Sequence, residues 1–295
     1  MLGRKKKAGF TVNGKPHDSR LQPDRPGVIS IEGRVKERPI NPMGVRTLRP
    51  DVFRPGQFGV FDALVHTCET AGIPLQYHFD EALHTHVIDS LDGERHWWYA
   101  ARYHGGPRLE EPAHRMDTHA YKDWMAISLY HVPEARLREL TAAHGGEVRR
   151  LANNGGAVIV PEVTLRTPEQ DLRFTNVEVT AHGLRRDIFW DGVMTAADIV
   201  LSLADQGGLS AELEWGEIVG QVLQQGYTFT HLNDEQLEDR TGFTYEVGER
   251  RFKGRQPRFG NNLIHMTADV RVILSPEYMH WAWTDLSGGR PAAEG

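Results

Sequence analysis

An internal repeat is the sequence feature that most constrains the fold. Residues 48–56 read LRPDVFRPG, and residues 184–192 read LRRDIFWDG, 136 positions further along the chain. The match continues without a gap, because FGVFDALVHTCETAG (58–72) lies against MTAADIVLSLADQGG (194–208). At 295 residues the chain has room for two domains of ordinary size. The repeat therefore predicts two equivalent structural units in one chain.

Each copy contains the same order of expected elements. Two strand-like runs come first, then a helix with one apolar face, short alternating strands and a closing apolar strand. In the first copy these are 27–35, 44–53, 58–71, 75–79, 85–91, 96–103 and 124–131. In the second copy the first runs are 157–165 and 177–189, and the closing strand is 270–277. The order predicts the α+β class, with two tandem β-grasp-like domains, each a mixed sheet with one packed helix, joined by a helical connector.

These patterns divide the chain into five segments. They are a basic flexible tail (1–26), a first β-grasp-like domain (27–132), a helical connector (133–156) that Gly145 and Gly146 could interrupt, a second β-grasp-like domain (157–286) and a flexible tail (287–295). No apolar segment follows the lysine run at 5–7, so no secretory signal is expected. As written, the chain is expected to be cytoplasmic. A start further upstream would leave export or anchoring open.

Composition excludes several classes of protein. A net charge of -6 and a pI of about 6.2 argue against a dedicated nucleic-acid binder. A single cysteine, Cys68, excludes a disulfide framework, and its place on the apolar helix face predicts a buried side chain. No apolar run is long enough to span a bilayer. The sequence has no phosphate-binding glycine loop and no hydrolase nucleophile motif, so it favours a protein without its own catalysis but leaves an enzyme open.

One segment resembles a known family. The run YHFDEALHTHVIDSLDGERHWWYAARYHGG (77–106), followed by HRMDTHAYKDWMAISL (114–129), is similar to the transcobalamin C-terminal-like β-grasp family, whose function is unknown. The second copy matches more loosely. The resemblance implies the β-grasp fold and raises cobalamin as a cofactor, because in the cobalamin carriers this domain caps a bound corrin. It implies no catalytic residues.

Histidines cluster in the first copy, where seven of the chain's 15 lie between residues 78 and 119. His84 and His86 stand two apart in a strand-like run, so both imidazoles are expected on one face, about 7 Å apart. With His78 and Asp80 they form a candidate site for a divalent metal, in a metal-binding protein or an accessory subunit of a metalloenzyme. The alternative is a solvated or hydrogen-bonded strand face.

A second candidate site lies on the strand with the double tryptophan. Trp97 and Trp98 are adjacent, so they are expected to point to opposite sides of the sheet, with one in the core. Arg102 and His104 share a side with Trp98, and together the three could stack a flat ligand such as a corrin beside a cation. The alternative is that the other domain covers this face.

A basic and aromatic loop, RRFKGRQPRFGNN (250–262), is the candidate partner-binding segment. Its cationic residues are Arg250, Arg251, Lys253, Arg255 and Arg258. A plain flexible loop is the alternative.

Taken together, the residues predict a non-catalytic protein that binds an unidentified small molecule or partner protein. The expected binding face carries His84, His86, Trp98, Arg102 and His104. A metal-binding protein and a structural scaffold in a larger complex are the alternatives, and the oligomeric state stays open.

Overall fold

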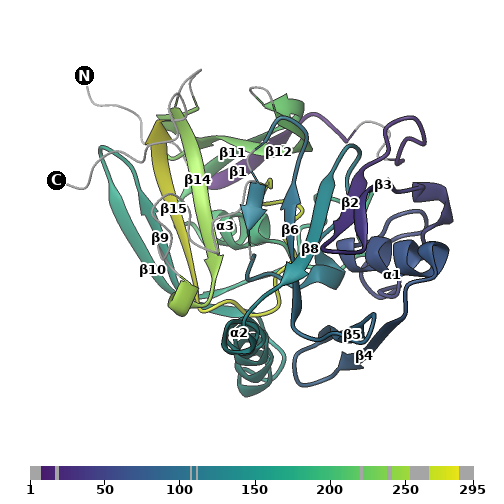
Figure 1. Cartoon of the computed structure of the whole chain (residues 1–295). Coiled ribbons are helices and arrows are strands. Elements are labelled where there is room, and N and C mark those ends of the chain that lie inside the picture. The colour runs from purple at the N-terminus through teal and green to yellow at the C-terminus, as the bar shows by residue number, and fades with distance from the viewer. Residues whose placement is uncertain are drawn as a thin grey trace, which may run out of the picture.

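The computed structural model describes residues 8–16, 20–106, 108–110, 112–219, 222–237, 241–252 and 266–285. Within these residues the chain forms three α-helices and four β-sheets, which confirms the α+β class. One sheet from each half of the chain lies on either side of the molecule, and helix α2 (Glu134–Asn153) lies below them (Figure 1). None of the helices in the described part of the chain is long and apolar enough to cross a membrane.

The first half builds a five-stranded sheet and a separate hairpin. The sheet order is β3 (Val35–Pro39), β2 (Val28–Ile31), β8 (Ala126–His131), β6 (Trp97–Arg102) and β7 (Arg108–Glu110). Strands β2 and β8 run parallel, and the other pairs run antiparallel. The hairpin joins β4 (Leu75–Asp80) to β5 (Thr85–Leu91).

Helix α1 (Val60–Ala71) packs its apolar face into the core of the first half. Phe61, Leu64 and Cys68 follow helical spacing and are buried, as the sequence predicted for this segment. The Asp62 carboxylate accepts the backbone N–H of Gly59 and so caps the first turn. The helix ends at Gly72, whose left-handed φ of 66° suits glycine.

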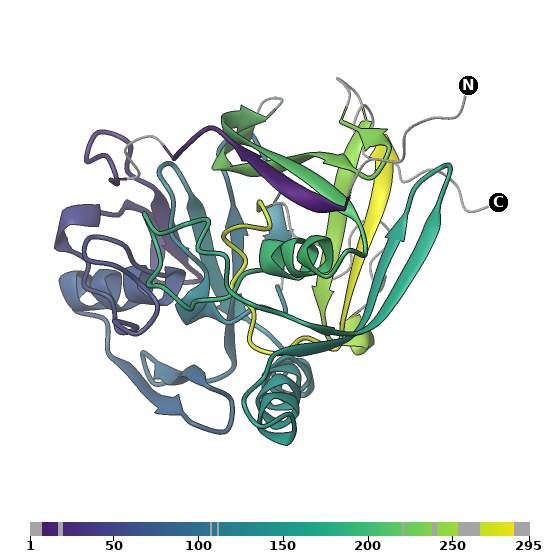
Figure 2. The ribbon, with the colours of Figure 1, turned by 180° about the vertical axis from the view of Figure 1, so that it is seen from behind.

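The second half repeats this arrangement. Its sheet order is β10 (Asp171–Glu178), β9 (Ile159–Arg166), β15 (Tyr278–Asp285) and β14 (Thr241–Gly248), again with a central parallel pair, β9 and β15. Helix α3 (Ala196–Asp205) corresponds to α1 and lies in the interior (Figure 2). The hairpin of β11 (Ser210–Val219) and β12 (Val222–Leu232) corresponds to β4–β5 and is extended by β1 (Gly9–Asn13) and β13 (Glu235–Gln236).

The two halves meet through reciprocal contacts of the repeated sequence. The backbone N–H of Arg54 donates to the Ile188 carbonyl at 2.9 Å, and that of Trp190 donates to the Val52 carbonyl at 3.1 Å. Between them the rings of Phe53 and Phe189 lie 5.6 Å apart. Such an exchange is the contact pattern of a twofold-symmetric interface, here within one chain. A continuous buried apolar cluster joins both halves.

Three expected strands are wrong, and all lie where a loop is packed into the core: 44–53, its counterpart 177–189, of which only 177–178 belong to a strand, and 270–277. Residues 44–53 form turns. The second strand of this half is β3 instead, because the left-handed φ of 69° at Gly33 folds the chain after β2 back into the β2–β3 hairpin. Residues 270–277 form no strand, although Val270 and Ile273 are buried. The closing strand is β15, which follows this segment. A buried loop shows the same apolar spacing as a strand.

The expected solvated arm and the expected helix interruption also differ from the structure. Gly9–Asn13 form strand β1, which pairs in parallel with β11, because Phe10 and Val12 alternate with polar residues and pack on the core. Helix α2 continues through Gly145, where a Cβ atom would lie 3.4 Å from the Leu83 side chain.

Candidate functional site

Matching ion-pair clusters stabilise the repeat in both halves. The Arg49 guanidinium donates to Asp51 and, at 3.1 Å, to Asp117. Arg185 donates in the same way to Asp187 and, at 3.0 Å, to Asp269. Both arginines and the two distant aspartates are buried, and breaking such a pair costs about 3–5 kcal/mol. Because the cluster recurs at equivalent positions, it belongs to the scaffold that both halves share.

The first half adds two further donors to its aspartate. The Asp117 carboxylate also accepts the Thr85 hydroxyl at 2.7 Å and the His86 ring at 3.0 Å. Burial alone would raise the pKa of Asp117, but the hydrogen bond from His86 and the charge of Arg49 lower it to about 2. In the second half Gly226 and Tyr227 occupy the equivalent positions, where the Tyr227 backbone N–H donates to Asp269 as that of His86 does to Asp117.

The structure does not bring the residues of the expected metal site together. His78 bonds Asp89 at 3.0 Å, and the Asp80 carboxylate caps the turn at Ala82. The left-handed φ of 52° at His84 breaks the strand alternation, and its ring lies 3.3 Å from the Arg49 guanidinium. In the part of the chain that the structure describes, no three histidine, cysteine, aspartate or glutamate side chains are grouped so as to hold a metal ion.

The expected ligand face is also wrong as a single surface. Trp98 is only 8% exposed, because its indole N–H donates to the Pro112 carbonyl at 3.0 Å and its ring faces His144 of α2. It therefore cannot stack on a ligand. Arg102 and His104 are exposed, and the His104 ring lies 5.1 Å from that of Trp124. His84 and His86 lie at the β4–β5 hairpin, which is a different sheet from β6.

The candidate partner-binding loop is described only at its start. Arg250 pairs with Glu277 at 3.3 Å and with Glu162 at 3.5 Å, so its charge is balanced inside the chain. Arg251 is exposed. Lys253, Arg255 and Arg258 lie outside the described residues.

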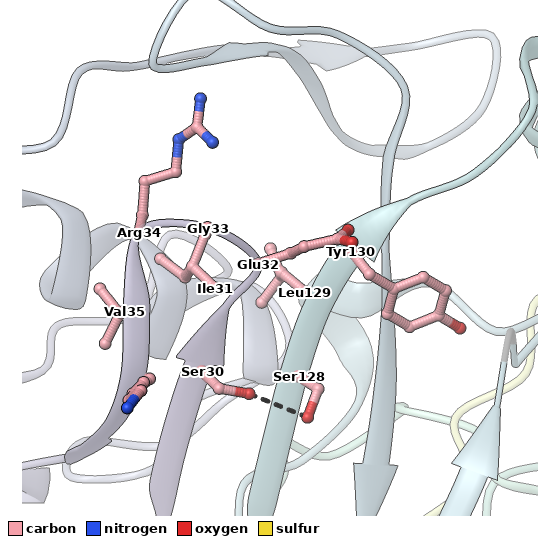
Figure 3. A pocket seen from close by; sticks show the side chains of 10 residues that line it. Ser30, Ile31, Glu32, Gly33, Arg34, Val35, Ser128, Leu129 and Tyr130 are labelled. Carbon is pink, nitrogen blue, oxygen red and sulfur yellow. Dashed lines mark hydrogen bonds between the residues drawn. The ribbon is translucent and has the colours of Figure 1, made fainter.

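A groove that the sequence analysis missed crosses the outer face of the first sheet. Its volume is about 600 Å³, within the range of roughly 300–1,000 Å³ typical of ligand sites. We call it the serine groove, because Ser30 of β2 and Ser128 of β8 form its floor (Figure 3). Its lining residues are Ser30, Ile31, Glu32, Gly33, Arg34, Val35, Lys36, Ser128, Leu129 and Tyr130.

The strand register explains why the groove is hollow. Ser30 stands beside Ser128 in the parallel β2–β8 pair, and Ala100 of β6 stands opposite Ser128 on the other side. The two serines thus lie side by side on the outer face, and the neighbouring Ala100 is small and buried, while Ile29, Ile127 and Leu129 point into the core. The signal was available in the sequence as small residues at the outward positions of VISI (28–31) and AISLYH (126–131).

The second half has larger side chains at the positions of the two serines. Thr164 and His280 stand where the first half has Ser30 and Ser128, and they are joined by a hydrogen bond of 2.6 Å. Ala282 stands where the first half has Tyr130. The groove is therefore a feature of the first half and not part of the shared scaffold.

No family model matches this chain, and no curated protein matches it.

Proposed function

We propose that this chain is a non-catalytic binding protein whose ligand lies in the serine groove. The observation that carries the proposal is the difference between the halves. A scaffold repeated with the same ion pairs and strand order has a hollow, hydroxyl-lined floor in one copy and larger side chains at the positions of the two serines in the other. Small outward residues on two adjacent strands, Ser30 and Ser128, contribute little to stability, so a binding role accounts for them better than packing does.

We further propose that each half is a β-grasp unit. The order β3-β2-β8-β6 with β2 and β8 parallel, together with a helix between the second strand and the hairpin, supports this fold for the first half. The order β10-β9-β15-β14 supports it for the second half. The resemblance to the transcobalamin C-terminal-like family stays a prediction.

The groove does not fit a corrin. A corrin is a broad macrocycle that needs apolar surface on its faces, whereas the floor of the groove presents two side-chain hydroxyls. The lining residues include no histidine or cysteine that could ligate cobalt. Trp98, which the sequence suggested for stacking, is buried. We therefore assign no role to cobalamin.

A groove-filling variant tests the proposal without knowledge of the ligand. Protein-observed NMR with a mixed library of metabolites should shift the amide signals of Ser30, Ser128 and Tyr130 for at least one compound class. Ser128→Phe should abolish these shifts, because the added ring occupies the floor. His280→Phe, at the equivalent position of the second sheet, is the matched control and should leave them unchanged. The proposal would be overturned if the shifts persist in Ser128→Phe, or if no compound of the library shifts these amide signals.

A further inference from the structure

The hydrogen-bonding pattern of the groove floor leaves donor capacity for a ligand. The Ser30 hydroxyl donates to the Ser128 oxygen at 3.0 Å and lies 3.4 Å from the Ile127 carbonyl (Figure 3). As the acceptor in this bond, Ser128 keeps its own hydroxyl hydrogen. Its Oγ can donate to a ligand while it still accepts from Ser30.

An aromatic ring borders the floor on the side of β6. The Tyr130 hydroxyl donates to the Tyr99 carbonyl at 3.4 Å, so the ring lies across the neighbouring strand and does not stand up from the sheet. Figure 3 shows this side chain directed away from Ser128 and along the surface. A half-buried ring held in this way offers an apolar platform of fixed orientation beside the two hydroxyls.

The charges around the groove do not favour a strongly charged ligand. Arg34 pairs with Asp92 at 3.1 Å and with Glu94 at 3.0 Å, and Figure 3 shows its guanidinium directed away from the floor. The Glu32 carboxylate accepts the backbone N–H of His131 at 2.9 Å. Lys36 remains as an exposed cation on the rim, opposite in sign to Glu32. The rim thus carries hydrogen-bonding groups of both signs around a neutral floor.

From these three features we infer that the serine groove binds a neutral, polyhydroxylated ligand of the saccharide class. Sugar rings have hydroxyl edges, which serine, glutamate and lysine side chains can bond, and weakly polar faces, which pack on an aromatic ring. The open shape of the groove suits a ligand of which one side stays in water. This inference rests on the proposed function and specifies its ligand.

Binding of defined probes tests the inference. Maltotetraose, cellotetraose and xylotetraose represent neutral saccharides, ATP represents an anion, and anilinonaphthalene sulfonate represents an apolar aromatic. We expect at least one tetrasaccharide to shift the Ser30, Ser128 and Tyr130 amides, with an affinity that changes less than twofold between low and high salt. A neutral ligand has no ion pair for salt to screen.

Three substitutions separate the contributions of the Ser128 hydroxyl and the Tyr130 ring to saccharide binding. Ser128→Ala removes one hydrogen bond and should weaken saccharide binding by about twofold to tenfold. Tyr130→Leu removes the platform and should weaken it further. Thr164→Val, which removes the corresponding hydroxyl in the second sheet, is the control and should leave the affinity unchanged.

The experiment distinguishes failure of the saccharide inference from failure of the proposed function. If only ATP or anilinonaphthalene sulfonate shifts the groove amides, or if binding falls steeply with salt, the saccharide inference is overturned and the proposed function stands. If neither these probes nor the metabolite library shifts those amides, both are overturned. Equal loss of affinity in Ser128→Ala and Thr164→Val would also overturn the inference, because it would place the ligand elsewhere.

Discussion

At the scale of single residues, the equivalent aspartates of the two halves separate what the scaffold requires from what one half has added. Asp117 and Asp269 both pair with a buried arginine, but only Asp117 accepts the additional side-chain bonds of Thr85 and His86. One oxygen of Asp269 has no hydrogen-bond partner among the described residues. The ion pair and one backbone N–H bond are therefore common to both halves, and the side-chain bonds of Thr85 and His86 are additions of the first half.

His119 should make the protein sensitive to acid. Its ring lies between the hydroxyls of Tyr99 and Tyr103 at 3.0 Å each, and burial, followed by the charges of Arg271 and Lys122, lowers its pKa to about 3. Between pH 3 and the unfolded value of 6.5 the unfolded chain therefore binds more protons than the folded one. Stability should fall as the pH decreases through this window.

Urea unfolding at pH 6.5 and pH 4 checks this expectation. The free energy of unfolding of the wild type should fall more between the two values than that of His119→Gln, which cannot titrate. Asp62 acts in the opposite direction, since its pKa is raised to about 6, but it is present in both proteins. Equal pH dependence of the two proteins would show that His119 is not the group responsible.

At the scale of elements, the sequence predicted the segments in which local pattern and tertiary role agree. The helix with Phe61, Leu64 and Cys68 and the strands of the β4–β5 hairpin were predicted because their spacing is set by one buried face. The loop around Val270 and the turn around Arg49 were mistaken for strands. Both are buried by contacts with segments distant in the sequence, which the local spacing of apolar residues does not reveal. The serine groove was missed, because it exists only once β3, β2 and β8 lie side by side.

Strand β1 belongs to a segment that the sequence predicted to be a solvated arm, so a variant of this strand tests whether it contributes to stability. Phe10 contacts the His182 ring at 5.4 Å, and Phe10 and Val12 pack on the core, whereas Thr11 is exposed. The double change Phe10→Ala and Val12→Ala should lower the free energy of unfolding by about 2 kcal/mol, since both side chains are partly buried. Thr11→Ala is the control, and urea unfolding is the measurement. A double variant no less stable than Thr11→Ala would contradict a structural role for the strand.

At the scale of the whole molecule, the two halves form a twofold-like pair that a single chain holds together. The reciprocal bonds of Arg54 and Trp190 and the tilted ring contact of Phe53 with Phe189 lie at the centre of this arrangement. The continuous apolar core means that neither half buries its inner surface alone. Covalent linkage through α2 is therefore expected to matter for assembly more than for maintenance of the folded state.

A cut between the halves tests that expectation in the intact protein. Gly155 and Gly156 follow α2 and are exposed, so a protease site inserted between them should be cleaved without disturbing a strand. After cleavage the two fragments should migrate as one species in size-exclusion chromatography, at the elution volume of the uncut chain. Fragments that separate in native buffer would show that the halves are independent domains.

The parallel pairing of β1 with β11 has a consequence for synthesis on the ribosome. Gly9 to Asn13 are synthesised about 200 residues before their partners, Ser210 to Glu214. Strand β1 must therefore wait, unpaired, while those residues are translated. The sheet that contains β1 can close only after residue 214 has emerged, and chains arrested before residue 210 are expected to expose β1 to chaperones and proteases.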